Sequence, residues 1–315
     1  MKLLVITPLK HLDGVYESLE SMENITDLYY EPDVTKDELK KLLIETNADY
    51  LFTNPNKQNF ILDRDILKGS SVIGINTAST GLNHIDLDYC EQNNIEVVSH
   101  KNDLELINDL PSTSELAFGL MMSLLRFIPT SFHSVKDGNW DYEPYVGHQI
   151  KGKTIGVIGY GRLGKIMCRL FDGWGVDTFV YDPYVHVEKD LGVDLNTLLD
   201  ESDVIFLHMH VTDETRGMVD EEFLSYMKEG SYLINTARGE LVDEEAIIES
   251  IKCGHLKGYG TDVIKDEFGD IQNSKLVKFS MNPNNNVVIT PHIGGMTIEG
   301  QTKAYHWAVN KLRGV

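Results

Sequence analysis

Basic residues are scarce in this chain. Its 315 residues contain 28 Lys and Arg against 49 Asp and Glu, which gives a formal net charge of -21 at pH 7. Proteins that bind nucleic acid or anionic membranes through non-specific electrostatics need basic patches, so this deficit argues against both partners. A site for an anionic substrate would have to supply its own local positive charge.

Cysteines and long apolar runs are also few. The three cysteines, Cys90, Cys168 and Cys253, form no CxxC motif, which favours reduced thiols and gives no sign of a metal site. The longest apolar stretch, 116–125, is interrupted by a glycine and a serine and falls short of the roughly 20 residues that span a bilayer. The run Leu3–Ile6 is too short for a signal peptide. We therefore expect a cytoplasmic protein that is not embedded in a membrane.

The remaining composition is that of a folded protein, with 42% hydrophobic residues. Short apolar runs alternate with amphipathic stretches, a pattern typical of α/β folds with parallel sheets covered by helices. The expected strands are Leu3–Ile6, Tyr50–Phe52, Val72–Ile75, Glu96–Val98, Thr154–Ile158, Thr178–Tyr181, Val204–Leu207, Tyr232–Ile234, Gly258–Thr261 and Val287–Ile289. The expected helices include Lys36–Glu45, Leu163–Gly173, Asp243–Ile251 and Thr297–Leu312.

The length suggests two domains, and a boundary is visible near residue 110. There Ser112 is a candidate N-cap, and Glu115 three residues later would complete a capping box. The helical stretch from about Thr297 follows the last strand and could fold back onto the first domain. We expect one discontinuous domain formed by 1–110 and 296–315, and a second formed by 111–295.

The second domain carries a dinucleotide-binding motif. The run Lys153–Ile158 leads into Gly159-Tyr160-Gly161-Arg162-Leu163-Gly164, a GxGxxG followed by a helical pattern. In such a motif the first glycine allows the tight turn, the second lets the backbone approach a pyrophosphate, and the third lets helix and strand pack closely. The helix N-terminus would offer N–H groups to the phosphates.

An acidic residue completes this motif. The next strand ends at Asp182, 18 residues after Gly164, and no arginine follows it. A carboxylate at this place accepts hydrogen bonds from the adenosine ribose and repels the additional phosphate of NADP. Because strand, glycines, helix, strand and acid are all in register, we predict that the cofactor is NAD.

Four charged or titratable residues follow strands of the same domain. Arg238 comes after Tyr232–Ile234, Asp262 closes Gly258–Thr261, Glu267 lies five residues further on, and His292 follows Val287–Ile289. Ligands of open parallel sheets bind beyond the carboxyl ends of the strands. Hydride transfer to a keto acid needs a cation for the carboxylate, an acid for the developing alkoxide, and a carboxylate that supports the acid. Arg238, His292 and Glu267 can fill these roles, although each alone is more often structural.

These residues and several segments resemble the D-isomer-specific 2-hydroxyacid dehydrogenases over nearly the whole chain. The segments that carry the resemblance are Ala78–Asp86, Lys153–Gly164, Thr212–Met218, Asn235–Gly239 and Thr290–Gly295. The resemblance implies two similar flavodoxin-like or Rossmann lobes, of which the discontinuous one binds substrate. It also implies homodimers that join through the cofactor lobe, and the helix from Ser112 fits that contact.

The resemblance further implies individual roles. Arg238, Glu267 and His292 match the catalytic arginine, glutamate and histidine of the family. Backbone N–H groups of Ser79, Thr80 and Gly81 would bind the substrate carboxylate, together with Arg238. Asp262 would bond the nicotinamide carboxamide, and Gly159, Gly161, Arg162, Leu163, Gly164, Asp182 and Thr236 would complete the cofactor site.

The chain departs from the family pattern in ways that leave the substrate open. The glutamate is followed by Phe268 instead of proline, His210 replaces a proline, and an asparagine-rich loop precedes His292. Where phosphoglycerate dehydrogenases often carry arginines for the phosphate, the segment 53–57 has Lys57 as its only cation. Asn54, Lys57, His84 and Lys101 are candidates for the distal pocket, although we expect them at the surface.

Several functions fit the sequence. The leading one is an NAD-dependent dehydrogenase of a small D-2-hydroxy acid. A 3-phosphoglycerate or phosphite dehydrogenase on the same scaffold is an alternative, whereas formate is disfavoured because the corresponding enzymes carry glutamine in place of Glu267. An NAD-sensing binding module, like the related C-terminal binding corepressors, would keep the same three residues without turnover.

Overall fold

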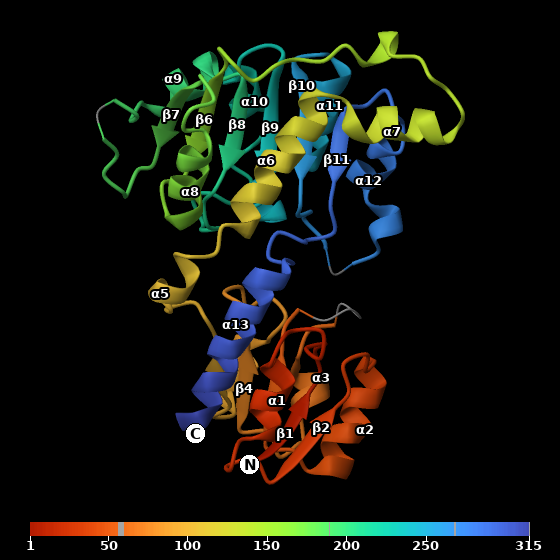
Figure 1. The fold of residues 1–315 in the computed structure, drawn as a ribbon, viewed down its shortest axis with the longest axis vertical. Coiled ribbons are helices and arrows are strands. Elements are labelled where there is room, and N and C mark those ends of the chain that lie inside the picture. The colour runs from red at the N-terminus through yellow and green to blue at the C-terminus, as the bar shows by residue number, and fades with distance from the viewer. Residues whose placement is uncertain (56–59, 189, 268, 315) are drawn as a thin grey trace. The chain divides into compact units, whose positions relative to one another are not determined.

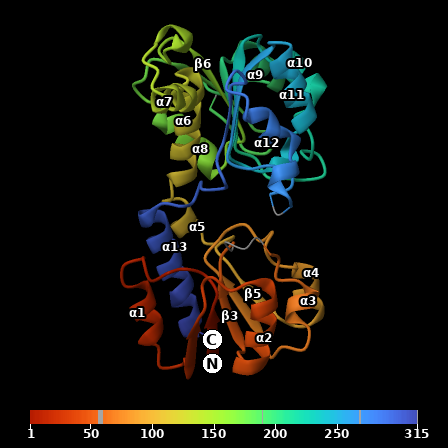
Figure 2. The ribbon, with the colours of Figure 1, turned by 90° about the vertical axis from the view of Figure 1, so that its right-hand side faces the viewer.

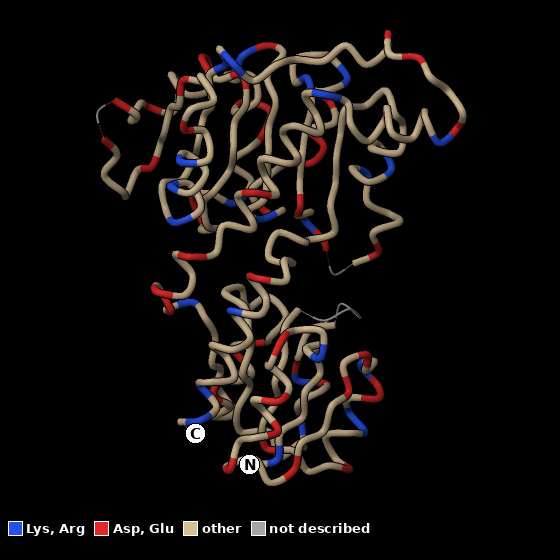
Figure 3. Tube along the Cα trace, viewed as in Figure 1, with Lys and Arg blue, Asp and Glu red and all other residues tan. Residues whose placement is uncertain are grey.

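The computed structural model describes residues 1–55, 60–188, 190–267 and 269–314. Lys57 and Phe268 lie outside the described residues. The chain forms two compact units, one of residues 1–110 and 296–315 and the other of residues 111–295. Acidic residues occur along the chain in both units (Figure 3).

The first unit is a five-stranded parallel sheet. Its strands are β1 (Lys2–Val5), β2 (Asp27–Tyr30), β3 (Tyr50–Thr53), β4 (Gly74–Thr77) and β5 (Glu96–Val98), in the order β2-β1-β3-β4-β5. This is the flavodoxin-like order. Helices α1 (Val15–Glu20) and α13 (Ile298–Lys311) pack on one face, and α2 (Lys36–Thr46), α3 (Arg64–Leu67) and α4 (Leu87–Gln92) on the other. Helix α5 (Leu104–Ile107) lies shortly before residue 110, where the first stretch of this unit ends.

Alternation along the strands explains why both faces are covered. Leu3 and Val5 belong to the cluster with α13, whereas Leu4 belongs to the opposite cluster with α2. Successive side chains of a strand point to opposite faces, so a fully apolar run needs helices on both sides. The C-terminal helix α13 returns to this sheet and buries Tyr305, Ala308 and Val309 there (Figure 1).

The second unit is a six-stranded parallel sheet. Its strands are β6 (Thr154–Ile158), β7 (Asp177–Tyr181), β8 (Val204–Leu207), β9 (Ser231–Asn235), β10 (Leu256–Thr261) and β11 (Val287–Ile289), in the order β11-β10-β9-β8-β6-β7. Gly192 makes an isolated parallel bridge to Val180 beside β7. When this bridge is counted as the third strand, the order is that of the Rossmann fold.

Helices cover both faces of this second sheet (Figure 2). Helices α6 (Ser112–Leu125) and α8 (Arg162–Leu170) pack on one face. Helices α9 (Leu195–Glu201), α10 (Glu221–Tyr226), α11 (Glu244–Lys252) and α12 (Lys275–Ser280) pack on the other, and α7 (Ile128–Lys136) follows α6. The α/β fold with two doubly wound sheets that the sequence predicted is confirmed.

Some local expectations were wrong. Ser112 is the first helical residue of α6, its N-cap position is taken by Pro111, and no side-chain cap forms. Strand β2 was not anticipated because Asp27–Tyr30 is a short edge strand with only partly buried side chains.

No single helix among the described residues has the length and hydropathy to cross a membrane. One bent pair, 104–125 with 128–136, reaches the required length and composition only when its two parts are taken together.

Candidate active site

The three glycines of the loop between β6 and α8 differ in the space around them. Gly159 has φ +99°, and a Cβ there would lie 2.5 Å from the carbonyl oxygen of His208. A Cβ on Gly164 would lie 2.0 Å from the carbonyl oxygen of Gly159, so helix and strand meet at this point. A Cβ on Gly161 would meet nothing within 4 Å. The loop is therefore closed against the protein at its two ends and open at its middle glycine, as a pyrophosphate cradle requires.

Buried polar atoms without partners lie at the carboxyl ends of the strands beside this loop. Within the described chain, both ring nitrogens of His208 and the hydroxyl of Thr236 are buried and have no hydrogen-bond partner. Burial, with the nearby charge of Arg162, lowers the pKa of His208 to about 4. Buried polar groups are normally paired, so these atoms fit the polar surface of a dinucleotide. Arg162 and Leu163 open α8, whose first-turn N–H groups can receive phosphate.

Asp182 directly follows β7, and its carboxylate is held by backbone. Oδ2 accepts a hydrogen bond from the N–H of Tyr160 at 2.7 Å, and Oδ1 accepts from Tyr184 at 2.8 Å and Val185 at 2.9 Å. Burial acts to raise its pKa, but these three N–H donors outweigh it, and the net pKa is lowered. Asp182 therefore carries a negative charge at neutral pH, fixed next to the glycine loop.

His292 and Glu267 form the central pair of the candidate active site. Nδ1 of His292 lies 2.7 Å from Oε2 of Glu267. The hydrogen bond to Glu267 raises the pKa of His292 despite partial burial of the imidazole. Because Glu267 accepts at Nδ1, Nε2 is the ring nitrogen that can exchange a proton with a ligand. The imidazole side chain is 43% exposed, so it is accessible for that exchange.

Asp262 holds the turn that carries His292. Its Oδ1 accepts hydrogen bonds from the Thr290 hydroxyl at 2.6 Å and the Ile293 N–H at 2.8 Å, and its Oδ2 accepts from the Gly294 N–H at 2.7 Å. Its backbone carbonyl accepts from the N–H of His292 at 2.9 Å. This bracing compensates the left-handed conformation of His292, which has φ +54°. Burial raises the pKa of Asp262. The sequence analysis predicted only that this carboxylate contacts the nicotinamide. It did not predict the hydrogen bonds of Asp262 to the turn that carries His292.

Arg238 follows β9, the strand that pairs with β10. Asn235 shapes its turn, because its amide donates to the carbonyl of Arg238 at 2.9 Å and its oxygen accepts from the N–H of Ala237 at 3.0 Å. The guanidinium donates to the carbonyl of Ala237 at 2.7 Å. Its charge lowers the pKa of His292, against the larger effect of Glu267. The structure thus brings Arg238, Glu267 and His292 together at the ends of neighbouring strands β9, β10 and β11.

The loop Ser79–Gly81 lies in the first unit, directly after β4 and Ala78. Within the described chain, the N–H groups of Ser79, Thr80 and Gly81 meet no hydrogen-bond acceptor. Backbone N–H groups without an acceptor remain able to donate hydrogen bonds to a ligand.

The residues suggested for a distal pocket have different surroundings. Lys101 is exposed, and the amide of half-buried Asn54 donates to the hydroxyl of Tyr305 at 3.1 Å. The expectation of a surface position is wrong for His84, which is 1% exposed.

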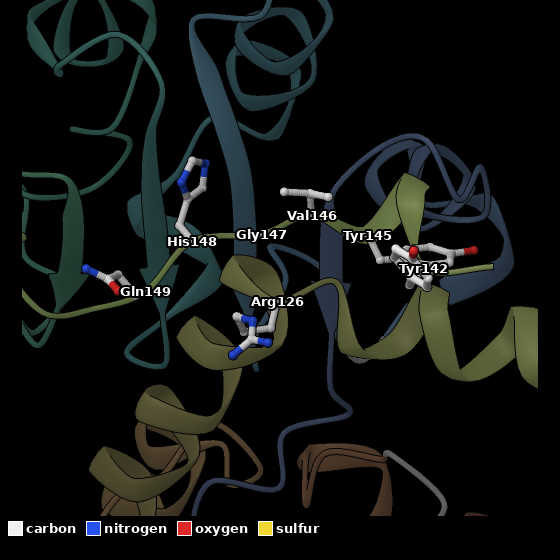
Figure 4. A pocket seen from close by; sticks show the side chains of 7 residues that line it. All are labelled: Arg126, Tyr142, Tyr145, Val146, Gly147, His148 and Gln149. Carbon is white, nitrogen blue, oxygen red and sulfur yellow. The ribbon is translucent and has the colours of Figure 1, made fainter. Parts of the chain in front are cut away.

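A separate open pocket lies elsewhere in the second unit, between the end of α6 and the segment 142–149 that precedes β6. It is lined by Arg126, Tyr142, Tyr145, Val146, Gly147, His148 and Gln149 (Figure 4). It contains none of the residues predicted for cofactor or catalysis.

Comparisons with known proteins point to one family. Residues 118–294 match the model of the D-isomer specific 2-hydroxyacid dehydrogenase NAD binding domain. The chain is 35% identical to hydroxypyruvate reductase of Thermotoga maritima over 282 residues, covering 88% of this chain and 87% of that protein. It is 31% identical to D-3-phosphoglycerate dehydrogenase of Methanocaldococcus jannaschii over 96% of this chain, but spans only 55% of that longer protein.

Solved structures agree with this assignment. The apo D-lactate dehydrogenase of Escherichia coli is 28% identical, with a TM-score of 0.80 over 99% of this chain and 96% of that one. The D-lactate dehydrogenase of Aquifex aeolicus, complexed with NAD and lactic acid, is 28% identical with a TM-score of 0.76, over 100% of this chain and 95% of that one.

Proposed function

The chain belongs to the family of D-isomer-specific 2-hydroxyacid dehydrogenases, NAD-dependent oxidoreductases of small hydroxy acids, and from this premise we propose which residues perform the reaction. His292 is the acid–base residue, Glu267 supports it, and Arg238 binds the substrate. The observation that carries this proposal is the 2.7 Å contact between His292 and Glu267, with Arg238 near enough to shift the pKa of the imidazole.

In the direction of reduction, each residue has a defined task. Arg238 holds the carboxylate of the keto acid and polarises its carbonyl, because a guanidinium offers a planar pair of donors. His292 donates the proton from Nε2 to the developing alkoxide. Glu267 keeps the proton on Nδ1 and stabilises the imidazolium. NADH, when bound, supplies the hydride.

The cofactor is held by the second unit in this proposal. Gly159, Gly161 and Gly164 shape the loop, Arg162 and Leu163 open the helix towards the pyrophosphate, and Asp182 accepts from the adenosine ribose. Thr236 and Asp262 lie at the nicotinamide end. The buried hydroxyl of Thr236, unpartnered in the described chain, supports this placement, as does the space at Gly161.

For the first unit, we propose that the N–H groups of Ser79, Thr80 and Gly81 bind the substrate carboxylate. Their lack of acceptors in the described chain supports this role. The discontinuous unit would then be the substrate domain, and 111–295 the cofactor domain.

Hydroxypyruvate is the first substrate to test, because a hydroxypyruvate reductase is among the relatives that match over most of both chains. A kinetic panel of hydroxypyruvate, glyoxylate, pyruvate, 2-ketoglutarate and 3-phosphohydroxypyruvate with NADH, followed at the nicotinamide absorbance, separates the candidates. A preference for 3-phosphohydroxypyruvate would favour the phosphoglycerate alternative, and phosphite oxidation is tested in the same assay with NAD.

A binding module of the corepressor type is the second candidate. It keeps the cofactor site and predicts NADH binding without turnover of any acid in the panel. Turnover that disappears in His292→Ala while NADH binding persists would reject it.

We also propose a homodimer in the cytoplasm that joins through the second unit. Helix α6 buries its apolar face against its own sheet, but α7 exposes Ile128, Phe132 and Val135. The three cysteines are free thiols, which supports a reducing compartment. Light scattering of the wild type and of Phe132→Glu tests the dimer, since a charge on a shared apolar face should yield monomers. A wild-type monomer would contradict it.

A further inference from the structure

The loop that follows β4 is supported by a hydrogen-bonded series of three side chains. Nε2 of His84 lies 3.1 Å from the hydroxyl of Thr77, and this hydroxyl lies 2.9 Å from the hydroxyl of Ser79. The Ser79 hydroxyl donates to the carbonyl of Gly81 at 2.8 Å. The series therefore begins at a buried imidazole and ends inside the loop Ser79–Gly81.

The direction of every hydrogen bond in this series is determined by its last member. A carbonyl only accepts, so the single proton of Ser79 is used on Gly81. Ser79 must then accept from Thr77, which uses the single proton of Thr77. Thr77 must in turn accept from His84, so Nε2 of His84 carries a proton. The network assigns the Nε2–H tautomer, with the donor order His84, Thr77, Ser79, Gly81.

The surroundings make His84 a rigid start for this series. The side chains of both His84 and Thr77 are buried, and the carbonyl of His84 accepts from the N–H of Leu62 at 2.8 Å. Burial lowers the pKa of His84 to about 4, so the ring is neutral near pH 7. A neutral Nε2–H donor is therefore present throughout the neutral range.

The series also decides what Ser79 can offer a ligand. Its hydroxyl proton is used on Gly81, and its carbonyl accepts from the N–H of His100 at 3.0 Å. Ser79 can therefore donate to an anion only through its backbone N–H.

We propose that His84 is a positioning residue that holds the carboxylate-binding loop in shape through Thr77 and Ser79. This inference rests on the proposed role of Ser79–Gly81 and goes beyond it. Loss of the relay should weaken substrate binding, because the loop N–H groups are no longer held in one orientation, and should leave the cofactor site in the other unit unchanged.

The test compares Thr77→Val with Thr77→Ser, which differ in whether the hydroxyl is present. Loss of one hydrogen bond typically changes an equilibrium about 5- to 10-fold. We expect Thr77→Val to raise the KM for hydroxypyruvate by that factor, with kcat and the Kd for NADH within about two-fold. Thr77→Ser keeps the hydroxyl, so its KM should stay within about two-fold of the wild-type KM. Equal KM values for the two variants would overturn the proposal.

His84 is tested in the same way with His84→Leu and His84→Gln, since the glutamine amide can donate near the position of Nε2. Only the leucine variant should raise the KM, and combining it with Thr77→Val should add little. Thermal unfolding of each variant separates a shift in KM from loss of fold. A raised Kd for NADH in parallel with the KM would show a general structural defect and overturn the proposal.

The tautomer gives a readout that needs no turnover. In ¹⁵N spectra of the histidine rings at pH 7, the signal absent from His84→Leu should be that of a neutral ring protonated at Nε2. A ring protonated at Nδ1 would overturn the relay. If the wild type turned over no keto acid, the proposed function would fail, while the tautomer would still decide the relay.

Discussion

The same added methyl group should affect different properties at Gly161 and at Gly164: the affinity for NADH at Gly161 and the stability of the fold at Gly164. A Cβ on Gly164 would lie 2.0 Å from the backbone oxygen of Gly159, whereas a Cβ on Gly161 meets nothing within 4 Å. A backbone atom cannot move aside as a side chain can, so overpacking at Gly164 should cost about 3 kcal/mol, the upper end of the usual range. Alanine returns about 1 kcal/mol of helix propensity. The net loss is about 2 kcal/mol.

For a unit of this size, about 2 kcal/mol corresponds to a decrease in Tm of about 4–8 °C. We expect this decrease for Gly164→Ala. Gly161→Ala changes only an N-cap residue and should cost about 1 kcal/mol or less. Its methyl group would, however, occupy the space proposed for the pyrophosphate, so the Kd for NADH should rise about 10-fold or more.

Differential scanning calorimetry and NADH fluorescence titration measure the two effects on the same samples. Binding of NADH by Gly161→Ala with the wild-type Kd would contradict a pyrophosphate site at Gly161. Unfolding of Gly164→Ala at the wild-type Tm would contradict the close approach of helix and strand at Gly164.

Three further predictions concern the charges of the site. His292→Ala should lower kcat by at least about 10² while NADH binding is retained, and a normal kcat would remove His292 from the mechanism. Reduction needs protonated His292, so the rate of reduction falls as the pH rises through the pKa of His292. Glu267 raises this pKa, so Glu267→Gln should move the fall in rate to lower pH. An unchanged pH profile would contradict the pairing of Glu267 with His292. Asp182→Asn removes the fixed charge beside the ribose, so the ratio of kcat/KM for NADPH to that for NADH should rise about 10-fold, and no change would show that Asp182 does not select the cofactor.

Local patterns explain why much of this fold could be predicted. Strand–helix alternation predicted the ten expected strands to within two residues at each end. The strand expected at Val72–Ile75 is displaced most and is Gly74–Thr77 in the structure. Ser112 illustrates the opposite case, since a serine three residues before a glutamate resembles a cap although Pro111 takes that position.

Long-range side-chain contacts explain what the sequence could not provide. The carboxylate of Asp262 bonds N–H groups 31 and 32 residues away, and no spacing rule encodes such a contact. His84 was expected at the surface, yet its side chain is buried, and its carbonyl accepts a hydrogen bond from the N–H of Leu62 on another segment. The individual roles of the site residues stay predictions.

The central claim is that Glu267 acts through His292, and a double-mutant cycle on kcat tests it most directly. Glu267→Gln, His292→Asn and the combined variant are compared with the wild type at one pH and saturating NADH. Residues that act as a unit are non-additive, so the combined variant should be as slow as His292→Asn within about two-fold. A combined variant whose loss of kcat equals the product of the two single losses would contradict a joint action of Glu267 and His292.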